Sequence, residues 1–458
     1  MPSASTIYAL SSAPGRAGVA VVRVSGPLAR HALAAMVRKP PGHGQAAFRI
    51  VRHPETGSPL DQALVLFFAG PNSETGEDVA EFQVHGGRAV VHAVLDALGG
   101  IPGCRLAEAG EFARRAFTNG KLDLAEVEGL ADLVDAETEA QRVQALAQSS
   151  GVLSKLYEGW RGALLEAMAL AEAAIDFSDE SDVSEQAMAA ARSGIAKLAG
   201  ALESHLADDR RGEILREGFR VALLGAPNAG KSSLLNALAR RDAAIVSEEA
   251  GTTRDVIEVR LDLGGYPVIV SDTAGLRDAG GAIEREGIRR SLAVAEHADL
   301  VLWLVEPGAG NRPPFGESRG ESSKVSRETG PLVLTVHTKS DLVETDLDKA
   351  KSVTAPGPGC AISAKTGAGV EALVARITGI AADRLASRSG PPLTQARHRQ
   401  ALETCLADIR AFMAGDPAEA ELRAEDLRRA AHALGRITGR VDVEDVLGQI
   451  FGRFCIGK

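Results

Sequence analysis

The chain has 458 residues, a length that is typical of about three domains. Hydrophobic residues make up 45% of it and charged residues 24%, as in an ordinary soluble globular protein. Its formal net charge of −10 argues against a protein that grips nucleic acid through a broad basic surface, while a local basic patch remains compatible with that charge.

The number and spacing of the cysteines also limit which class of protein this can be. The chain has 4 of them, at Cys104, Cys360, Cys405 and Cys455, and their spacing matches neither a zinc site nor a disulfide framework. A reducing, cytoplasmic environment is therefore expected. No apolar run approaches roughly eighteen residues, and no charged-then-apolar segment opens the chain, so we expect neither membrane insertion nor secretion.

Residues 1–119 are predicted to form an α+β domain. The apolar runs 19–24 and 63–68 predict strands, and the segment 85–87 (HGG) predicts the start of a helix. Short strands separated by glycine turns are typical of a sheet with helices packed on it.

Helices are predicted on both sides of a central segment. Residues 120–216 are alanine-rich, and spacings of three and four predict one buried face, formed by Ile195, Leu198, Leu202 and Leu206. Helices resume after Pro391 and Pro392, within residues 383–458. The last of them has an apolar face made of Val443, Val446, Leu447, Ile450, Phe451 and Phe454, and it leads into a short tail that is predicted to move freely.

The central segment, residues 217–382, contains a phosphate-binding loop. Residues 225–232 (GAPNAGKS) follow an apolar run and precede a helical one, the order in which a strand, a loop and a helix bind a nucleoside triphosphate. The glycines allow backbone N–H groups to approach the phosphates, Lys231 would reach the β and γ oxygens, and Ser232 would bind Mg²⁺. A glycine-, proline- and serine-rich stretch at 308–330 predicts a flexible surface insertion.

Two further motifs predict a Ras-like hydrolase. Residues 272–275 (DTAG) end an apolar strand, where Asp272 would hold the Mg²⁺ shell and Gly275 would donate its N–H to the γ-phosphate. In the polar loop 251–255, Thr253 could give Mg²⁺ a second hydroxyl ligand.

The nucleotide is predicted to be GTP. Residues 338–341 (TKSD) follow a strand, and a carboxylate at Asp341 can accept from guanine N1 and N2 together, which adenine does not offer. Thr338 stands where such loops usually carry asparagine, so we expect weaker guanine affinity. The complete predicted GTP-binding set is Asn228, Ala229, Gly230, Lys231, Ser232, Ser233, Ser247, Glu248, Glu249, Ala250, Gly251, Thr252, Thr253, Asp272, Thr273, Ala274, Gly275, Thr338, Lys339, Asp341, Ser363, Ala364 and Lys365.

Catalysis needs a cation that the usual motifs do not supply. Leu276 occupies the position where most small GTPases carry a glutamine that orients the attacking water, and leucine cannot hydrogen-bond. Asn228 is a candidate ligand for a monovalent ion beside the phosphates, together with oxygens from the loop 247–252. The alternative is that Asn228 only braces its own loop.

Segments outside these motifs carry a family resemblance. They are residues 13–19 (APGRAGV) with 22–26 (VRVSG), 73–81 (SETGEDVAE) with 85–87 (HGG), 110–124 (GEFARRAFTNGKLDL) and 455–458 (CIGK). Over nearly its full length the chain resembles the MnmE (TrmE) family of tRNA-modification GTPases.

The resemblance implies a folate site in the N-terminal domain, which in the family mediates a homodimer. A 5-formyl- or 5,10-methylene-tetrahydrofolate would lie against Arg23, Glu81, Lys121 and Lys458. Cations can pair with its oxyanions, and a carboxylate can accept from the pterin. Without the resemblance, a surface ion pair would be the preferred interpretation of Arg23 and Glu81.

The resemblance also implies the architecture and the ion site. The helices on either side of residues 217–382 would form one discontinuous domain into which the GTPase (G) domain is inserted, and the G domains of a dimer would meet when GTP and K⁺ are bound. By matched position, K⁺ would lie between Asn228, Ser247, the backbone carbonyl of Glu249, and Thr252. Glu284 would orient the attacking water, although a solvated helix face is the default interpretation of that charge.

The implied function is a K⁺-stimulated GTPase. With the FAD protein MnmG, in a heterotetramer, it would add an aminomethyl-type group to C5 of the wobble uridine of certain tRNAs. Cys455 could act there as a nucleophile, although an incidental thiol is the simpler interpretation. The alternatives are a ribosome-assembly GTPase without modification chemistry, and a folate-dependent aminomethyltransferase with no use for GTP.

Overall fold

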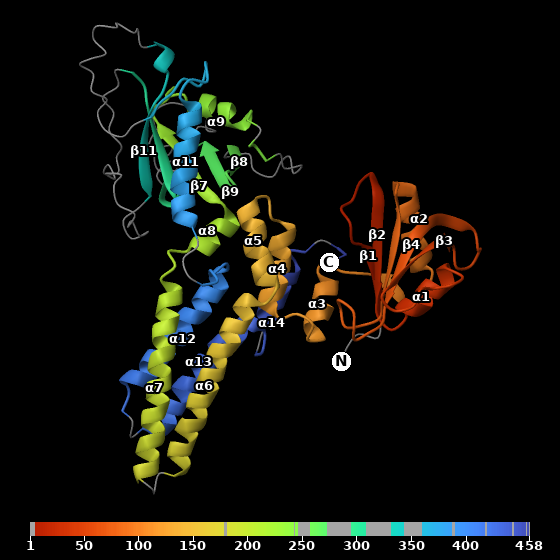
Figure 1. Ribbon diagram of the computed structural model, residues 1–458, viewed down its shortest axis with the longest axis horizontal. Helices are drawn as coiled ribbons and strands as arrows, with labels where there is room; N and C mark the ends of the chain where they lie inside the picture. The colour runs from red at the N-terminus through yellow and green to blue at the C-terminus, as the bar shows by residue number, and fades with distance from the viewer. Residues whose placement is uncertain are drawn as a thin grey trace, which may run out of the picture. The chain divides into compact units, whose positions relative to one another are not determined.

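The computed structural model describes residues 5–177, 181–241, 243–245, 257–272, 295–307, 331–342, 360–386, 390–416, 419–441, 444–454 and 456–457. The chain divides into two compact units (Figure 1). The first contains Met1–Ala131, Gln148–Gly162 and Ala431–Lys458, and the second contains Asp132–Ala147 and Ala163–Ala430. The predicted G domain, 217–382, falls within the second unit, and the predicted boundaries at 119, 216 and 382 stay predictions.

The first unit is built on a six-stranded sheet in the order β3-β4-β5-β2-β1-β6. Neighbouring strands are antiparallel except for β1 and β6, which are parallel. The strands predicted at 19–24 and 63–68 are confirmed as parts of β2 and β4. The bounds are β1 Thr6–Leu10, β2 Ala17–Ser25, β3 Gln45–Arg52, β4 Pro59–Phe68, β5 Val79–Gly86 and β6 Cys104–Leu106.

Two helices, α1 (Ala29–Met36) and α2 (Arg88–Gly99), share a core with this sheet. Val22 and Val24 of β2 belong to that core, so the residue between them points to the opposite face of the sheet. The helix predicted to open at 85–87 begins at Arg88, and His85 and Gly86 are still strand residues. The strand continues there because Gly86 packs against β2, where a Cβ would lie 2.5 Å from the Ala17 carbonyl oxygen.

Helix α3 (Glu111–Thr118), helix α4 (Leu124–Val134) and helix α14 (Glu444–Phe451) add a second core to this unit. The predicted apolar face of the last helix is confirmed where it is described, since Ile450, Phe451 and Phe454 are buried and Leu447 packs beside them. Val443 and the side chain of Val446 lie outside the described residues.

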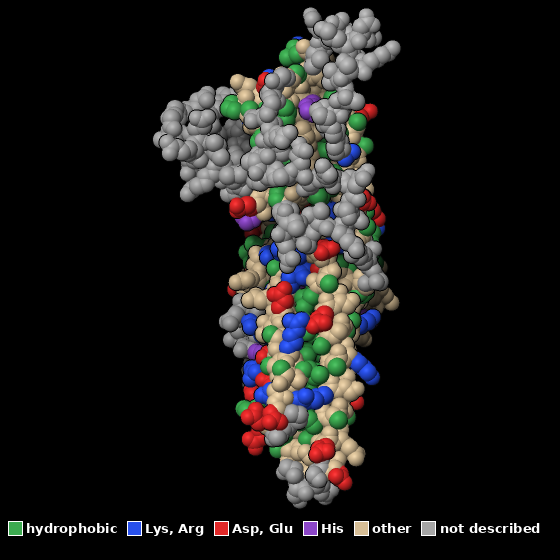
Figure 2. Space-filling model, turned by 90° about the vertical axis from the view of Figure 1, so that its left-hand side faces the viewer, with side chains coloured by type: hydrophobic (Ala, Val, Ile, Leu, Met, Phe, Trp, Pro, Cys, Tyr) green, Lys and Arg blue, Asp and Glu red, His purple; other side chains and the backbone are tan. Residues whose placement is uncertain are grey.

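Long helices in the second unit form a bundle. Helices α7 (Ser181–Leu206) and α12 (Ala396–Ala414) pack together, and they run beside parts of α6 (Val152–Asp176) and α13 (Ala420–Thr438) (Figure 1). The predicted stripe lies inside, with Ile195, Leu198 and Leu202 buried and Leu206 half-buried. Figure 2 shows one face of this bundle, where acidic, basic and hydrophobic side chains are interspersed, without a broad patch of one charge.

The G domain is a doubly wound α/β sheet in the order β12-β11-β10-β7-β9-β8. All neighbouring strands are parallel except β8 and β9. Strands buried on both faces read as continuous apolar runs, as in β10 (LVLWLV). The bounds are β7 Phe219–Gly225, β8 Ile257–Leu263, β9 Tyr266–Asp272, β10 Leu300–Val305, β11 Leu332–His337 and β12 Cys360–Ala361, with α8 Arg211–Glu217, α9 Lys231–Ala239, η2 Ser340–Leu342 and α11 Val370–Leu385.

The predicted fold class is confirmed: an α+β N-terminal domain, an all-helical part and a Ras-like G domain. Helix α5 spans Glu139–Ser149. Among the described helices, none combines the length and the apolar character that crossing a bilayer requires. The predicted insertion at 308–330 lies outside the described residues.

Candidate functional site

The loop between β7 and α9 has the backbone of an anion cradle. Gly225 has a φ of 150°, and a Cβ there would lie 2.5 Å from the Leu304 carbonyl oxygen, so only glycine fits. Asn228 and Gly230 have φ values of 64° and 89°. Alternation of left-handed and right-handed residues turns successive N–H groups toward one point, where α9 begins. This geometry fits a bound phosphate.

The Lys231 ammonium is held over this loop. Its Nζ donates to the carbonyl oxygens of Gly225 and Ala226, each at 2.9 Å. The pKa of Lys231 is lowered, because burial disfavours the ammonium more than the nearby Asp272 carboxylate favours it. Phosphate oxygens can replace these carbonyl acceptors, so the lysine is already positioned for a β- or γ-phosphate.

Ser232 and Asp272 meet at the mouth of the cradle. Ser232 Oγ donates to Asp272 Oδ2 at 2.7 Å. Asp272 ends β9 in register with Leu223 of β7, and it is 1% exposed. A hydroxyl oxygen beside a buried carboxylate is the hard-oxygen pair that Mg²⁺ prefers, so these residues fit a magnesium ion.

The loops on either side of this pair lie outside the described residues. They include the predicted ligands Ser247, Glu248, Glu249, Ala250, Gly251, Thr252 and Thr253, the residues Thr273, Ala274 and Gly275, and also Leu276 and Glu284. Of the predicted K⁺ ligands, the structure describes Asn228 alone. Ala229, the next residue, is buried, and Ser233 in the first turn of α9 is exposed.

Thr338 joins the base-binding loop to the sheet. Its N–H and its Oγ1 donate to the Val305 carbonyl oxygen at 2.9 and 3.3 Å, and the residue is 4% exposed. A Cβ at Gly230 would lie 3.8 Å from the Thr338 side chain, so the threonine packs beside the phosphate loop. Thr338 therefore braces the loop by packing, while its hydroxyl is engaged by Val305.

The predicted guanine acceptor is oriented by a second loop. Ser363 Oγ donates to Asp341 Oδ1 at 2.6 Å, and Ser363 is fully buried. This hydrogen bond holds the pKa of Asp341 below its usual range, so the carboxylate stays ionised. Lys339 donates to Glu306 Oε1 at 2.8 Å, a partner that the sequence motifs did not indicate. Ala364 is half-buried and Lys365 is exposed at the end of this loop.

A second polar site lies on the N-terminal sheet. Arg23 of β2 faces its register partner Glu81 of β5, with Nε and Nη2 each 3.0 Å from Glu81 Oε1. Arg23 also pairs with Glu74, 2.7 Å from Nη1 to Oε2, and its guanidinium carbon lies 5.8 Å from the centre of the Phe112 ring. These side chains lie on the face opposite α1 and α2. Sequence reasoning missed Glu74, although it belongs to the family segment 73–81.

Lys121 borders the same loop, residues 70–78. Its Nζ donates to the Pro71 carbonyl oxygen at 3.0 Å. Asn119 Nδ2 donates to the Thr75 carbonyl oxygen at 2.7 Å, and Gly76 is left-handed with a φ of 77°. Arg23 and Lys121 thus both contact loop 70–78, and Glu81 is joined to the loop only through Arg23.

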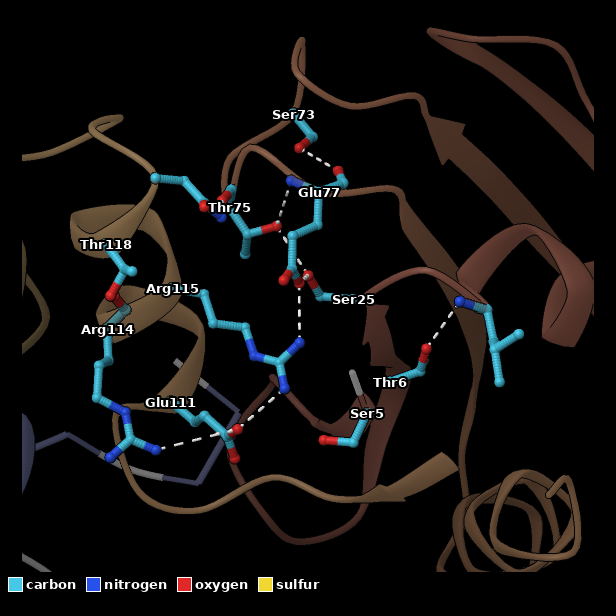
Figure 3. Close-up of polar contacts among 12 residues, drawn as sticks. Ser5, Thr6, Ser25, Ser73, Thr75, Glu77, Glu111, Arg114, Arg115 and Thr118 are labelled. Carbon is cyan, nitrogen blue, oxygen red and sulfur yellow. Dashed lines mark hydrogen bonds and ion pairs between the residues drawn. The ribbon is translucent and has the colours of Figure 1, made fainter. Parts of the chain in front are cut away.

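A network of polar side chains anchors loop 70–78 to β2 and α3 (Figure 3). The hydroxyls of Ser25 and Thr75 lie 2.7 Å apart, and Ser25 Oγ donates to Glu77 Oε2 at 2.9 Å. Arg115 donates to Glu77 at 2.9 Å and to Glu111 at 3.0 Å. Because the loop is anchored to both strand and helix, its backbone is held in place beside Arg23 and Lys121.

The C-terminal tail is docked against this domain, contrary to the prediction of free movement. Ser11 Oγ donates to the Gly457 carbonyl oxygen at 2.9 Å, and Ile456 forms an antiparallel bridge with Ala109. A Cβ at Gly457 would lie 2.1 Å from the Leu10 carbonyl oxygen, so the tail follows the end of β1 closely. Cys455 and Lys458 themselves lie outside the described residues.

The fold of the G domain, its phosphate-binding loop 225–232 and its loop 338–341 define a P-loop GTPase. Residues 6–121 match the family model of the GTP-binding protein TrmE N-terminus, and residues 124–455 match that of the MnmE helical domain. The tRNA modification GTPase MnmE of Parvibaculum lavamentivorans is 54% identical over 99% of this chain and 100% of its own length. Those of Maricaulis maris and Caulobacter vibrioides are 52% and 50% identical, over 99% of both chains in each pair.

The chain therefore belongs to the MnmE family of tRNA modification GTPases. It binds GTP, hydrolyses it and acts in tRNA modification, as predicted. Family membership does not favour the two alternatives, a ribosome-assembly GTPase and an aminomethyltransferase with no use for GTP.

Proposed function

We propose that the chain is a homodimeric, K⁺-stimulated GTPase that works with the flavoprotein MnmG on the wobble uridine of certain tRNAs. Together they add an aminomethyl-type group to C5, taking the carbon from a tetrahydrofolate. The observation that carries this proposal is that Arg23, paired with Glu81, and Lys121 both contact loop 70–78, through Glu74 and Pro71. A site with both signs of charge in a tRNA modification GTPase calls for a charged co-substrate besides GTP.

In the proposed nucleotide site, Lys231 neutralises the β- and γ-phosphates, and the backbone of the cradle orients them. Ser232 and Thr253 would hold Mg²⁺, with Asp272 behind them, and the ion supplies positive charge where negative charge develops. Asp341 accepts from guanine N1 and N2, and Ser363 holds that carboxylate in place. Leu276 cannot orient water, so that task would fall to Glu284.

Asn228, Ser247, Glu249 and Thr252 would hold K⁺ beside the phosphates. The ion supplies the charge that an arginine finger gives in other GTPases, where the gain is about 10³- to 10⁵-fold in rate. Asn228 has a left-handed backbone within the phosphate loop, and its amide oxygen is the atom that would bind the ion.

The proposed folate site uses complementary charges. Glu81 would accept from the pterin N3 and amino group, while Arg23, Lys121 and Lys458 would pair with oxyanions of the folate. The docking of Gly457 at the end of β1, the strand next to Arg23, supports a place for Lys458 in this site. Cys455 would act as a nucleophile, either in transfer of the one-carbon unit or in activation of the uracil ring.

Nucleoside mass spectrometry tests the proposal as a whole. A deletion strain should lack the C5 modification at wobble uridine, and the parent gene should restore it. Genes carrying Arg23→Ala or Ser232→Ala should fail, because one lacks the folate contact and the other the Mg²⁺ ligand. Unchanged wobble uridines in the deletion strain, together with disturbed ribosome profiles, would support a role in ribosome assembly instead.

A further inference from the structure

Arg23 is shared between two carboxylates that differ in how they are held. Glu81 is a strand residue opposite Arg23 in the sheet, and 16% of its side chain is exposed. Glu74 reaches the same guanidinium from loop 70–78, and 49% of its side chain is exposed. Glu81 is thus part of the folded sheet, whereas Glu74 can leave Arg23 without uncovering the core.

The backbone on either side of Glu74 is fixed. Ser73 Oγ donates to the Glu77 carbonyl oxygen at 2.5 Å, and the Thr75 side chain is fully buried beside Ser25. Release of Arg23 therefore requires only a change of rotamer at Glu74, not a movement of the loop. The Arg23 side chain is only 17% exposed, but it keeps Glu81 as a partner when Glu74 turns away, so no buried charge is left unpaired and the change costs little.

The charges decide what Glu74 does to a ligand. With Glu74 in place, one guanidinium faces two carboxylates, and an anionic ligand meets both an occupied cation and an extra negative charge. We propose that Glu74 competes with the ligand's oxyanion for Arg23 and so lowers the affinity of this site for folates. The inference rests on the proposed folate site and adds a residue that tunes it.

The experiment is calorimetry with 5-formyltetrahydrofolate on the full-length protein. Glu74→Gln keeps the shape of the side chain and removes the charge, and it should tighten binding about two- to fivefold, the amount that release of a partly exposed ion pair can supply. The difference should shrink at high salt, because salt screens exposed charges. Glu108→Gln is the matched control, since Glu108 is an exposed partner of Arg114 at 3.2 Å in the same domain.

The variant Arg23→Ala distinguishes a failure of the Glu74 inference from a failure of the proposed folate site. Binding should be lost in this variant, and Glu74→Gln should have no effect in its background. If Arg23→Ala weakens binding and Glu74→Gln leaves it unchanged or weaker, Glu74 is not a competitor, although the folate site stands. If neither the parent nor Glu74→Gln binds the folate, or if Arg23→Ala binds as tightly as the parent, both the site and its tuning are wrong.

Discussion

The Ser232 hydroxyl donates to the Asp272 carboxylate across 2.7 Å, joining the first turn of α9 to the end of β9. The two residues are separated by 40 positions in the chain, yet strand pairing of β7 with β9 brings them together. A conformational change at the start of α9 or at the end of β9 would therefore move a residue of the proposed Mg²⁺ site.

Ser232→Ala should leave the fold intact and lower kcat/KM for GTP by at least about 100-fold, equivalent to about 2.7 kcal/mol of transition-state stabilisation. The reason is the loss of a hydroxyl ligand, so the Mg²⁺ concentration for half-maximal rate should rise. Steady-state hydrolysis over a Mg²⁺ titration measures both. Asn236→Ala, at an exposed position of the same helix, is the control. Parental kinetics in Ser232→Ala would remove Ser232 from the site.

The ion prediction follows from Asn228. GTP hydrolysis should be much faster in K⁺ than in Na⁺ at matched ionic strength, and Asn228→Ala should lose most of this difference while GTP still binds. Because Asn228 has a φ of 64°, alanine also adds backbone strain, so Asn228→Gly is the needed partner variant. If glycine retains the K⁺ response that alanine loses, the effect is strain. Equal parental rates in the two salts would exclude K⁺ stimulation.

Base selection should depend on the charge of Asp341. Asp341→Asn should weaken GTP binding about 10- to 100-fold, the value of hydrogen bonds to a charged group, and should improve binding of xanthosine triphosphate, whose C2 carbonyl can accept from the new amide. Ser363→Ala should give a smaller loss, since the carboxylate remains but is no longer oriented. Fluorescent-nucleotide titration measures all three. Preserved guanine preference in Asp341→Asn would place base recognition elsewhere.

The Asp341 carboxylate also predicts how GTP affinity depends on pH in the same titration. The hydrogen bond from Ser363 lowers the pKa of Asp341, so protonation sets in only below the usual range of an aspartate. Asp341 itself should therefore add no pH dependence to GTP affinity between about pH 8 and about pH 5.

The strand, loop and helix at 219–239 could be predicted from the sequence, because the motif dictates its own local backbone. The loop 225–232 needs glycine where φ is positive and where the chain passes close to β10, and these needs are visible in the residues themselves. The roles of Thr338 were less accessible. A missing asparagine suggests a lost brace, yet packing of Thr338 beside Gly230 supplies one, and only the folded chain reveals that contact.

Partners that come from distant segments could not be predicted. Arg23 pairs with Glu74, and Lys339 pairs with Glu306. In the sequence these two glutamates look like ordinary surface charges, and nothing in their spacing identifies them as partners. Ser11 and Gly457 are separated by 446 positions, so their hydrogen bond depends entirely on tertiary placement. This contact is also why a tail that looks free in the sequence is docked.

Glu111 should make the N-terminal domain sensitive to acid. Burial alone would raise its pKa, but hydrogen bonds from Arg105, the Glu108 N–H and Arg115 lower it from 4.5 to about 2. A lowered folded-state pKa stabilises the fold above the unfolded pKa of 4.5, and that stabilisation is lost as the pH falls toward about 2. Glu111→Gln should cost about 3 kcal/mol at pH 7, since two arginines lose a buried partner.

Amide hydrogen exchange in α3 under urea, at pH 7 and at about pH 3, measures this cost. The gap between parent and Glu111→Gln should narrow at the lower pH, because the carboxyl of the unfolded parent is then protonated and unfolding is coupled to proton uptake. Glu108→Gln, which removes an exposed carboxylate nearby, should change stability little at either pH. A gap that is constant with pH would mean that Glu111 stabilises α3 through packing alone.

The tail prediction concerns Cys455, which stands next to the docked residue Ile456. Ile456 pairs with Ala109, and Gly457 with Ser11, so the residues that follow Cys455 in the chain contact the domain that holds Arg23. A thiolate is a strong nucleophile and serine a weak one at neutral pH. Cys455→Ser should therefore hydrolyse GTP at the parental rate and lose tRNA modification in a reconstituted assay with MnmG.

Cys104→Ser is the control for that experiment. Cys104 lies in the same domain, and burial raises the pKa of its thiol, so it is not a ready nucleophile. The serine variant at 104 should modify tRNA like the parent, whereas the variant at 455 should not. If Cys455→Ser also modifies tRNA at the parental rate, a covalent role for the thiol is excluded, and the tail then contributes to the site through Lys458 and the docking of Gly457.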